Sequence, residues 1–127
     1  MSFKLTGIEV ELLWTMNELG EDEESTDWYE GEVGDVEYNW TLADFIENIR
    51  RDYDGEDWCK YNLIYTNEND YHDTYVLMFN DNDELTTVTH GKQEYNHLKP
   101  EAMKKDYTNS KMTDILVMDP DELISTT

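Results

Sequence analysis

Carboxylates are the side chains whose number and spacing point to chemistry in this sequence. Residues 5–49 hold fourteen Asp and Glu residues and no Lys or Arg. Disordered acidic tails are poor in aromatic and β-branched residues, because they bury nothing. Here the acids instead surround Trp28 and Tyr29 and alternate with residues that favour burial. The pattern predicts a folded surface whose negative charge is its functional property.

The charge balance of the whole chain restricts the partners. The chain has 31 acidic and 9 basic residues, which gives a formal net charge of −22. Before Trp58 there are 3 bases and 18 acids (net −15), and after it 6 bases and 13 acids (net −7). Such a charge attracts basic surfaces and repels polyanions. We therefore expect a basic protein as partner, and neither direct nucleic-acid binding nor membrane binding.

Length and composition predict one acidic globular domain over residues 1–127, with the last few residues frayed. Hydrophobic residues make up 38% of the 127 residues, which is enough for one modest core. The single cysteine, Cys59, cannot form an internal disulfide and suits a reducing compartment. Neither a bilayer-spanning apolar run nor the apolar core of a signal peptide is present. We expect an intracellular protein, and the sequence leaves its oligomeric state open.

Other kinds of chemical site find little support. No run of acids has the ligand spacing of an EF-hand loop. His72, His90 and His97 lack the close ligand pairs of a zinc site. Nothing around Cys59 resembles an activated nucleophile. With 31 acids, some carboxylates lie close by chance, so pairs of them carry no information about acid–base catalysis. We expect a protein that is not an enzyme and that has no metal site and no cofactor.

The first element fits two periodicities. Ile8, Val10 and Leu12 alternate with polar residues as in a half-buried strand, with Gly7 at a bulge. Residues 8–19 also fit a helix with one apolar face. The choice stays open at this point, although we favour the strand because it agrees with a resemblance described below.

The clearest element is a helix over residues 42–53. Thr41 and Asp44 have the spacing of a helix start. The apolar residues that follow repeat at helical spacing; they are Leu42, Phe45, Ile46 and Ile49. Tyr53, Asp54 and Gly55 end the pattern. We predict that this helix is an insertion in an otherwise strand-rich chain.

The remaining chain is predominantly predicted as strands. We expect an acidic loop over 17–27 and a short helix around 101–105. Alternation and apolar runs predict strands over 28–33, 36–40, 61–65, 74–79, 85–89 and 115–118. The fold class predicted is α+β: a small antiparallel sheet or SH3-like barrel of about five strands, with one inserted helix (about 42–53) and a short C-terminal helix or loop segment.

Two stretches resemble Tudor and Agenet-type domains, which are SH3-like barrels. VELLW (10–14), followed by an acidic loop and WYEGEV (28–33), is similar to their first two strands. YNLIY (61–65) before NEND (67–70) is similar to a later strand and an acidic turn. The chain departs from these domains in its inserted helix, in a turn without Gly, and beyond residue 90.

The resemblance implies an aromatic cage for a methylated Lys or Arg, because ring faces attract a weakly hydrated cation. The cage residues it implies are Trp14, Trp28, Tyr65 and Tyr71, with Asp70 or Asp73 as the carboxylate. The competing interpretation is that Trp14 and Tyr65 are core residues and that Trp28 packs at the surface.

Two main functions fit the sequence. The first is a nucleic-acid mimic that occupies the Lys and Arg rows of a nuclease or DNA-binding protein, similar as a class to phage and mobile-element inhibitors of restriction or CRISPR nucleases. Its predicted contact residues are Glu21, Asp22, Glu23, Glu24, Asp27, Trp28, Tyr29, Glu30, Glu32, Asp35 and Glu37. The second is a Tudor-type reader of methylated basic tails. A third is an immunity protein or antitoxin against a basic toxin. A mimic would act in a bacterial cytoplasm, and a reader in a eukaryotic nucleus.

Overall fold

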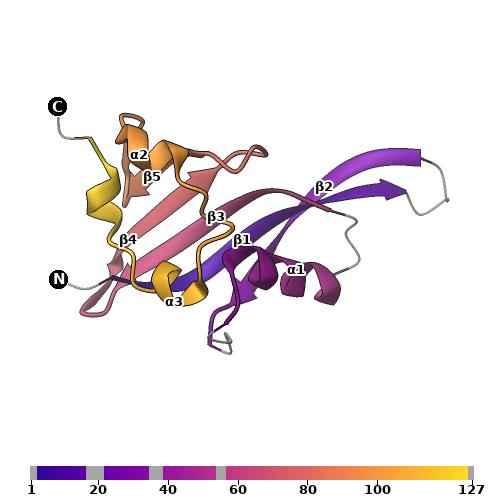
Figure 1. The fold of residues 1–127 in the computed structure, drawn as a ribbon, viewed down its shortest axis with the longest axis horizontal. Coiled ribbons are helices and arrows are strands. Elements are labelled where there is room, and N and C mark those ends of the chain that lie inside the picture. Colours follow the sequence, from indigo (N-terminus) through magenta and orange to yellow (C-terminus); the bar gives the residue numbers. More distant parts are fainter. Residues whose placement is uncertain (1–2, 17–21, 35–38, 54–56, 126–127) are drawn as a thin grey trace.

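Six strands form one antiparallel sheet in the order β2-β1-β3-β4-β5-β6 (Figure 1). The computed structural model describes residues 3–16, 22–34, 39–53 and 57–125. The strands are β1 Phe3–Met16, β2 Asp22–Glu32, β3 Asp57–Asn67, β4 Asp70–Phe79, β5 Leu85–His90 and β6 Gln93–Tyr95. The helices are α1 Leu42–Asp52, α2 Pro100–Lys104, α3 Met112–Ile115 and a single 3-10 turn, η1, at Pro120–Leu123. The predicted α+β class with an antiparallel sheet is confirmed.

The sheet is open, since β2 and β6 are its two outer strands. A closed SH3-like barrel is therefore not confirmed by the strands that the structure describes. The predicted inserted helix does lie between the second and third strands, as α1. None of the helices in the described ranges combines the length and the apolar character that crossing a membrane requires.

β1 resolves the ambiguity of the first element in favour of a strand. The register with β3 shifts between Leu5 and Gly7, so that Thr6 is an extra residue at a β-bulge, as the sequence predicted near Gly7. The bulge moves the buried positions from odd to even numbers: Phe3 and Leu5 before it, and Ile8, Val10 and Leu12 after it. Each of these side chains therefore faces the core. Residues 17–19 lie outside the described residues.

α1 begins and packs as its sequence predicts. The Thr41 side chain accepts a hydrogen bond from Asp44 N at 3.2 Å, and Asp44 Oδ2 accepts one from Thr41 N at 3.0 Å. This reciprocal capping box satisfies two backbone donors that a helix start leaves without partners. Its buried residues are the four predicted ones, Leu42, Phe45, Ile46 and Ile49. The apolar stripe thus fixes which side of α1 meets the sheet.

Gly31 of β2 lets α1 approach closely. A Cβ atom built at this position would lie 2.4 Å from Ile49 Cδ1 and 3.1 Å from Phe45 Cε1. The first distance is one that real Cβ atoms essentially never show, so a side chain at this position would force Ile49, or α1 with it, to move. Figure 1 shows α1 lying across β1 and β2.

One face of the sheet forms the core, and none of the described helices lies over the other face (Figure 1). The covered face holds the fully buried side chains of Tyr61, Leu63, Tyr65 and Leu77. Helices α2 and α3 add Ala102, Met112 and Ile115 to the same cluster. Residues between these strand positions point to the opposite side and are half-buried or exposed. We call that side the uncovered face.

The hairpin predicted from residues 74–79 and 85–89 is confirmed as β4 and β5. The chain turns at Asn80, whose Oδ1 accepts hydrogen bonds from Asn82 N at 2.9 Å and Glu84 N at 3.0 Å. Asp83 takes a positive φ of 63° in this turn, a conformation that Asp and Asn tolerate better than most residues. A register shift beside Phe79 makes Val88 the second buried position of β5, in place of strict alternation.

The sequence predictions of local structure need correction at several places. The acidic loop predicted over 17–27 is wrong from Asp22 onward, because β2 begins there and pairs with β1. The strand predicted over 115–118 is wrong: α3 ends at Ile115, and Leu116 N continues the turn by donating to Met112 O at 2.9 Å. The strand β6 was not predicted. Of the strand predicted over 36–40, residues 36–38 lie outside the described residues, and Asn39 and Trp40 are not in a strand.

Candidate acidic binding face

Among the side chains that the structure describes, the uncovered side of β1 and β2 carries three carboxylates in a fixed arrangement. Glu9 lies directly opposite Glu30, and Glu11 lies directly opposite Trp28. Directly opposite residues share one face of an antiparallel pair. These four residues, with Leu13 on the same side, form what we call the acidic face. Along a strand, side chains on one face repeat roughly every 6.6–6.8 Å, so the sheet sets the spacing between Glu9 and Glu11.

The pair of Glu9 and Glu30 is unfavourable for the isolated fold. Like charges directly opposite each other destabilise a sheet. Asn62 of β3 lies on the other side of Glu9, and Lys60 lies beside Glu11. Among the described residues, no ion pair involves Glu9, Glu11 or Glu30. Glu11 thus has a lysine directly opposite it on β3, whereas the residues directly opposite Glu9 are Glu30 and Asn62, neither of which is a cation.

Trp28 is the large apolar residue of the acidic face. It is 47% exposed, although it sits in the middle of a regular strand. Its direct neighbour across the pair is Glu11, and Leu13 on the same side is half-buried. Aromatic residues dominate the energetics of protein interfaces. An exposed indole surrounded by carboxylates is thus suited to an apolar anchor within a charged contact.

The rest of the uncovered face is less charged. From β3 to β5 it presents mainly apolar and hydroxyl side chains, including Ile64, Val76, Met78, Thr87 and Thr89. Met78 is 39% exposed. The carboxylates are thus concentrated at the β1–β2 end, and the uncovered face changes from charged to apolar across the sheet.

The contact residues predicted from the sequence divide into four groups. Trp28 and Glu30 belong to the acidic face. Asp27 pairs with Leu12 and Tyr29 with Val10, so both lie on the covered side of the ribbon. Asp22, Glu23, Glu24 and Glu32 belong to β2, but the structure does not describe their side chains. Glu21, Asp35 and Glu37 lie outside the described residues. Glu9 and Glu11 were missed, although their alternation with Ile8 and Val10 was visible.

The residues of the predicted aromatic cage are not brought together. Trp14 and Trp28 lie on opposite sides of the β1–β2 pair, and the Trp14 ring lies 6.2 Å from that of Tyr29. Tyr65 is fully buried, and its hydroxyl donates to Ile115 O. Burial raises the pKa of Tyr65 above its ordinary range. Tyr71 is 81% exposed at the distant β3–β4 turn.

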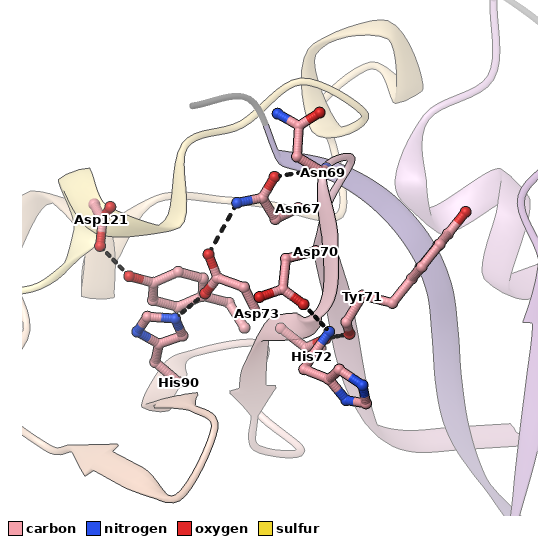
Figure 2. Close-up of polar contacts among 10 residues, drawn as sticks. Asn67, Asn69, Asp70, Tyr71, His72, Asp73, His90 and Asp121 are labelled. Carbon is pink, nitrogen blue, oxygen red and sulfur yellow. Dashed lines mark hydrogen bonds and ion pairs between the residues drawn. The ribbon is translucent and has the colours of Figure 1, made fainter.

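The β3–β4 turn instead holds a network of satisfied polar groups (Figure 2). Asp73 accepts hydrogen bonds from Asn67 Nδ2 at 2.9 Å and from His90 Nε2. These two bonds, Asn67 first, lower the pKa of Asp73. Asp70 Oδ1 accepts from His72 N at 2.9 Å, and Figure 2 shows Tyr71 pointing away from Asp73 and His90. The arrangement joins the β3–β4 turn to the end of β5.

Cys59 and the histidines do not meet in a reactive group. The Cys59 thiol donates to the Glu11 carbonyl at 3.4 Å, and burial raises its pKa. In the part of the chain that the structure describes, no three His, Cys, Asp or Glu side chains gather closely enough to hold a metal ion. No known protein-family model matches the chain, and no curated protein or solved structure matches it significantly.

Proposed function

We propose that this chain is a non-enzymatic acidic binding protein that engages the Lys- and Arg-rich surface of a nucleic-acid-acting protein through its acidic face. The observation that carries this proposal is the group of Glu9, Glu11 and Glu30 around the exposed Trp28, without an ion pair among the described residues. On this proposal the protein acts as a nucleic-acid mimic and inhibits its partner.

The arrangement supports this function because the charges are fixed before binding. Side chains on paired strands keep their spacing, so a partner meets carboxylates whose relative positions are set by the sheet. Duplex DNA presents about one negative charge per 1.7 Å of its axis, and proteins that bind it use rows of Lys and Arg. A rigid row of carboxylates can occupy such rows and steer association through its field.

The cost of the Glu9–Glu30 pair also supports an external partner. Proteins break local rules of stability mainly where function requires it. A bound Lys or Arg side chain would relieve the repulsion between these two carboxylates. No contact in the structure favours the methyl-reading alternative at the predicted cage, so that alternative becomes an outcome of the test.

The test compares two triple variants that remove the same charge. The site variant is Glu9→Gln/Glu11→Gln/Glu30→Gln, and the control is Glu94→Gln/Glu101→Gln/Glu122→Gln, at exposed positions far from the acidic face. Both variants change the net charge from −22 by +3 to −19. Wild type and both variants are immobilised and exposed to a nuclease-treated lysate of the source cells. Proteins that wild type and control capture, and the site variant does not, are then purified.

Each purified partner is titrated in a displacement assay with a fluorescent 20-base-pair DNA duplex at low salt. We expect wild type and control to displace the duplex, and the site variant to need at least about tenfold more protein. Affinity should also fall steeply with salt. Equal capture by all three proteins, or captured partners that do not bind DNA, would contradict the proposal. Capture that depends on methylation of the partner would support the reader instead.

A further inference from the structure

A pocket lies between α1 and the edge strand β2. It is on the covered side of the sheet, opposite the acidic face. Its volume is about 340 Å³, and among the described residues it is lined by Glu30 and Gly31 of β2 and by one stripe of α1 that includes Asn48 and Asp52. Residues 45, 48, 49 and 52 recur at helical spacing, which brings them to one side of the helix. The volume lies in the range of small-molecule sites.

Part of the lining of this pocket is apolar or aromatic: Trp40, Phe45, Ile49 and Tyr53. Gly31 leaves room at the floor, where a side chain would collide with Ile49. Trp40 stands at one end, with its ring 6.3 Å from that of Phe45 at an angle of 57°. Tyr53 stands at the other end, with its ring 4.0 Å from that of Tyr29. The two end rings are thus each held by a second aromatic ring.

The rim of the pocket is acidic. Asp52 is an exposed carboxylate that forms no ion pair within the described residues. Glu30 also lines the pocket, but it lies opposite Glu9, so its side chain points to the uncovered face. Asn48 adds an amide. Aromatic faces and carboxylates together favour an organic cation. A group with several N–H donors gains charge-assisted hydrogen bonds to the carboxylates as well.

A guanidinium group fits this combination better than a methylated ammonium does. Guanidinium is planar, stacks on aromatic rings, and presents five donors to carboxylates and amides. A fully methylated ammonium has no donor and would leave the acidic rim without hydrogen bonds. One guanidinium–amide contact of this kind already exists in the chain: Arg51 Nη2 donates to Asn48 Oδ1 at 3.3 Å beside the pocket.

We propose that the pocket between α1 and β2 binds the guanidinium group of an arginine side chain from another protein. The planar group stacks on the Tyr53 ring, and Asp52 accepts its hydrogen bonds, while Trp40 lines the same pocket. A basic partner of the kind proposed above would supply such a side chain. The pocket shares only Glu30 with the acidic face, and its affinity for arginine can be measured without any partner, so either proposal can fail while the other stands.

The experiment is a titration of ¹⁵N-labelled protein with N-acetyl-arginine amide at low salt. The readout is the indole N–H cross-peak of Trp40, assigned with Trp40→Phe, while the Trp58 peak serves as reference. N-acetyl-citrulline amide is the matched probe, because it has nearly the same shape without the charge. We expect a saturable shift of the Trp40 peak with the arginine derivative and none with the citrulline derivative.

Variants and two further probes sharpen the result. Asp52→Asn should weaken binding about fivefold or more, since it removes one charged acceptor, whereas the control Glu101→Gln on α2 should leave it unchanged. Equal shifts with arginine and citrulline derivatives, or a shift that never saturates, would overturn the proposal. Tighter binding of N-acetyl-trimethyllysine amide would overturn the choice of guanidinium. Tighter binding of free arginine would overturn the choice of a protein side chain over a metabolite.

Discussion

The two ends of the sheet hold their carboxylates in opposite ways. Around β3, β4 and β5, Asp73 is bonded to Asn67 and His90, and Asp83 accepts from the Tyr61 hydroxyl and from Thr108 Oγ1 at 3.0 Å. Asp121 accepts in the same way from the Tyr75 hydroxyl. Along β1 and β2, the carboxylates of the acidic face form no ion pair among the described residues.

This difference separates structural charge from charge directed outward. The β3–β5 carboxylates connect loops to the sheet through hydrogen bonds, so their removal should lower the free energy of unfolding. The carboxylates of the acidic face form no ion pair among the described residues, so their removal should mainly weaken binding. The net charge of the chain does not reveal this difference between the two groups of carboxylates. The four predictions that follow test it, from the largest expected effect to the smallest.

The largest effect should come from apolar truncation at the two ends. Leu63→Ala removes a fully buried side chain from the covered face and should lower the free energy of unfolding by roughly 2–5 kcal/mol, through lost burial and a cavity. Leu13→Ala, on the half-buried acidic face, should cost less than about 1 kcal/mol. Urea unfolding of both variants measures the difference. Similar costs would mean that the acidic face is packed against something.

The second prediction concerns Asp83, at a positive φ. Asp83→Ala should cost roughly 1–3 kcal/mol, because the buried Tyr61 hydroxyl loses its acceptor and Ala tolerates this backbone poorly. Asp83→Asn keeps an acceptor and the backbone, and should cost little.

Asp83 also predicts a pH effect of defined sign. Burial raises the pKa of Asp83 above its unfolded value of 3.8. Its ionised form is therefore disfavoured in the folded state. Wild type should gain stability relative to Asp83→Asn as the pH falls through the raised pKa, and the gain should be complete below 3.8. A difference that is independent of pH would contradict the assignment.

The third prediction reverses that sign at Asp73. Its hydrogen bonds to Asn67 and His90 lower its pKa below 3.8. The stability it contributes should be fully present above 3.8 and lost as the pH falls through the lowered pKa. The free energy of unfolding of Asp73→Asn should therefore approach that of wild type as the pH falls. Unfolding curves between neutral pH and about pH 2 check this, and Asp70→Asn, at the same turn, is the control.

The smallest effect is expected on the acidic face. Glu9→Gln should raise stability by roughly 0.2–1 kcal/mol at low salt, since it removes a like-charge pair across β1 and β2. The gain should shrink at about 1 M salt, where the screening length is about 3 Å. Glu94→Gln on β6 should show no comparable gain. A loss of stability in Glu9→Gln would show that its carboxylate has a structural partner after all.

Much of the fold followed from local patterns, but only where these patterns were strong. Thr41 and Asp44 define the start of α1 by themselves, and the glycine at position 7 marks the bulge. The length of β2 was underestimated because Asp and Glu have low strand propensity. Only the pairing with β1 overrides this propensity. Residues 115–118 are apolar enough for a strand, yet Ile115 is buried and Val117 is 70% exposed, which reflects contacts that no local pattern contains.

The candidate sites were harder to predict than the fold. Tyr65 was expected either in a cage or in the core, and periodicity could not choose between them. Glu9 and Glu11 were overshadowed by the denser acids that follow. The pocket beside α1 depends on Gly31 and on residues of two separate elements, so only the three-dimensional packing reveals it.

The bulge in β1 makes the direction of its side chains sensitive to insertions and deletions. Thr6 is the extra residue that moves the buried positions from odd to even numbers. A one-residue deletion or insertion between Thr6 and Ile8 would exchange inside and outside for the rest of the strand. Glu9 and Glu11 would then point into the core, and Ile8 and Val10 into solvent. Homologous chains should therefore tolerate substitutions on the acidic face far more readily than changes in the length of this segment.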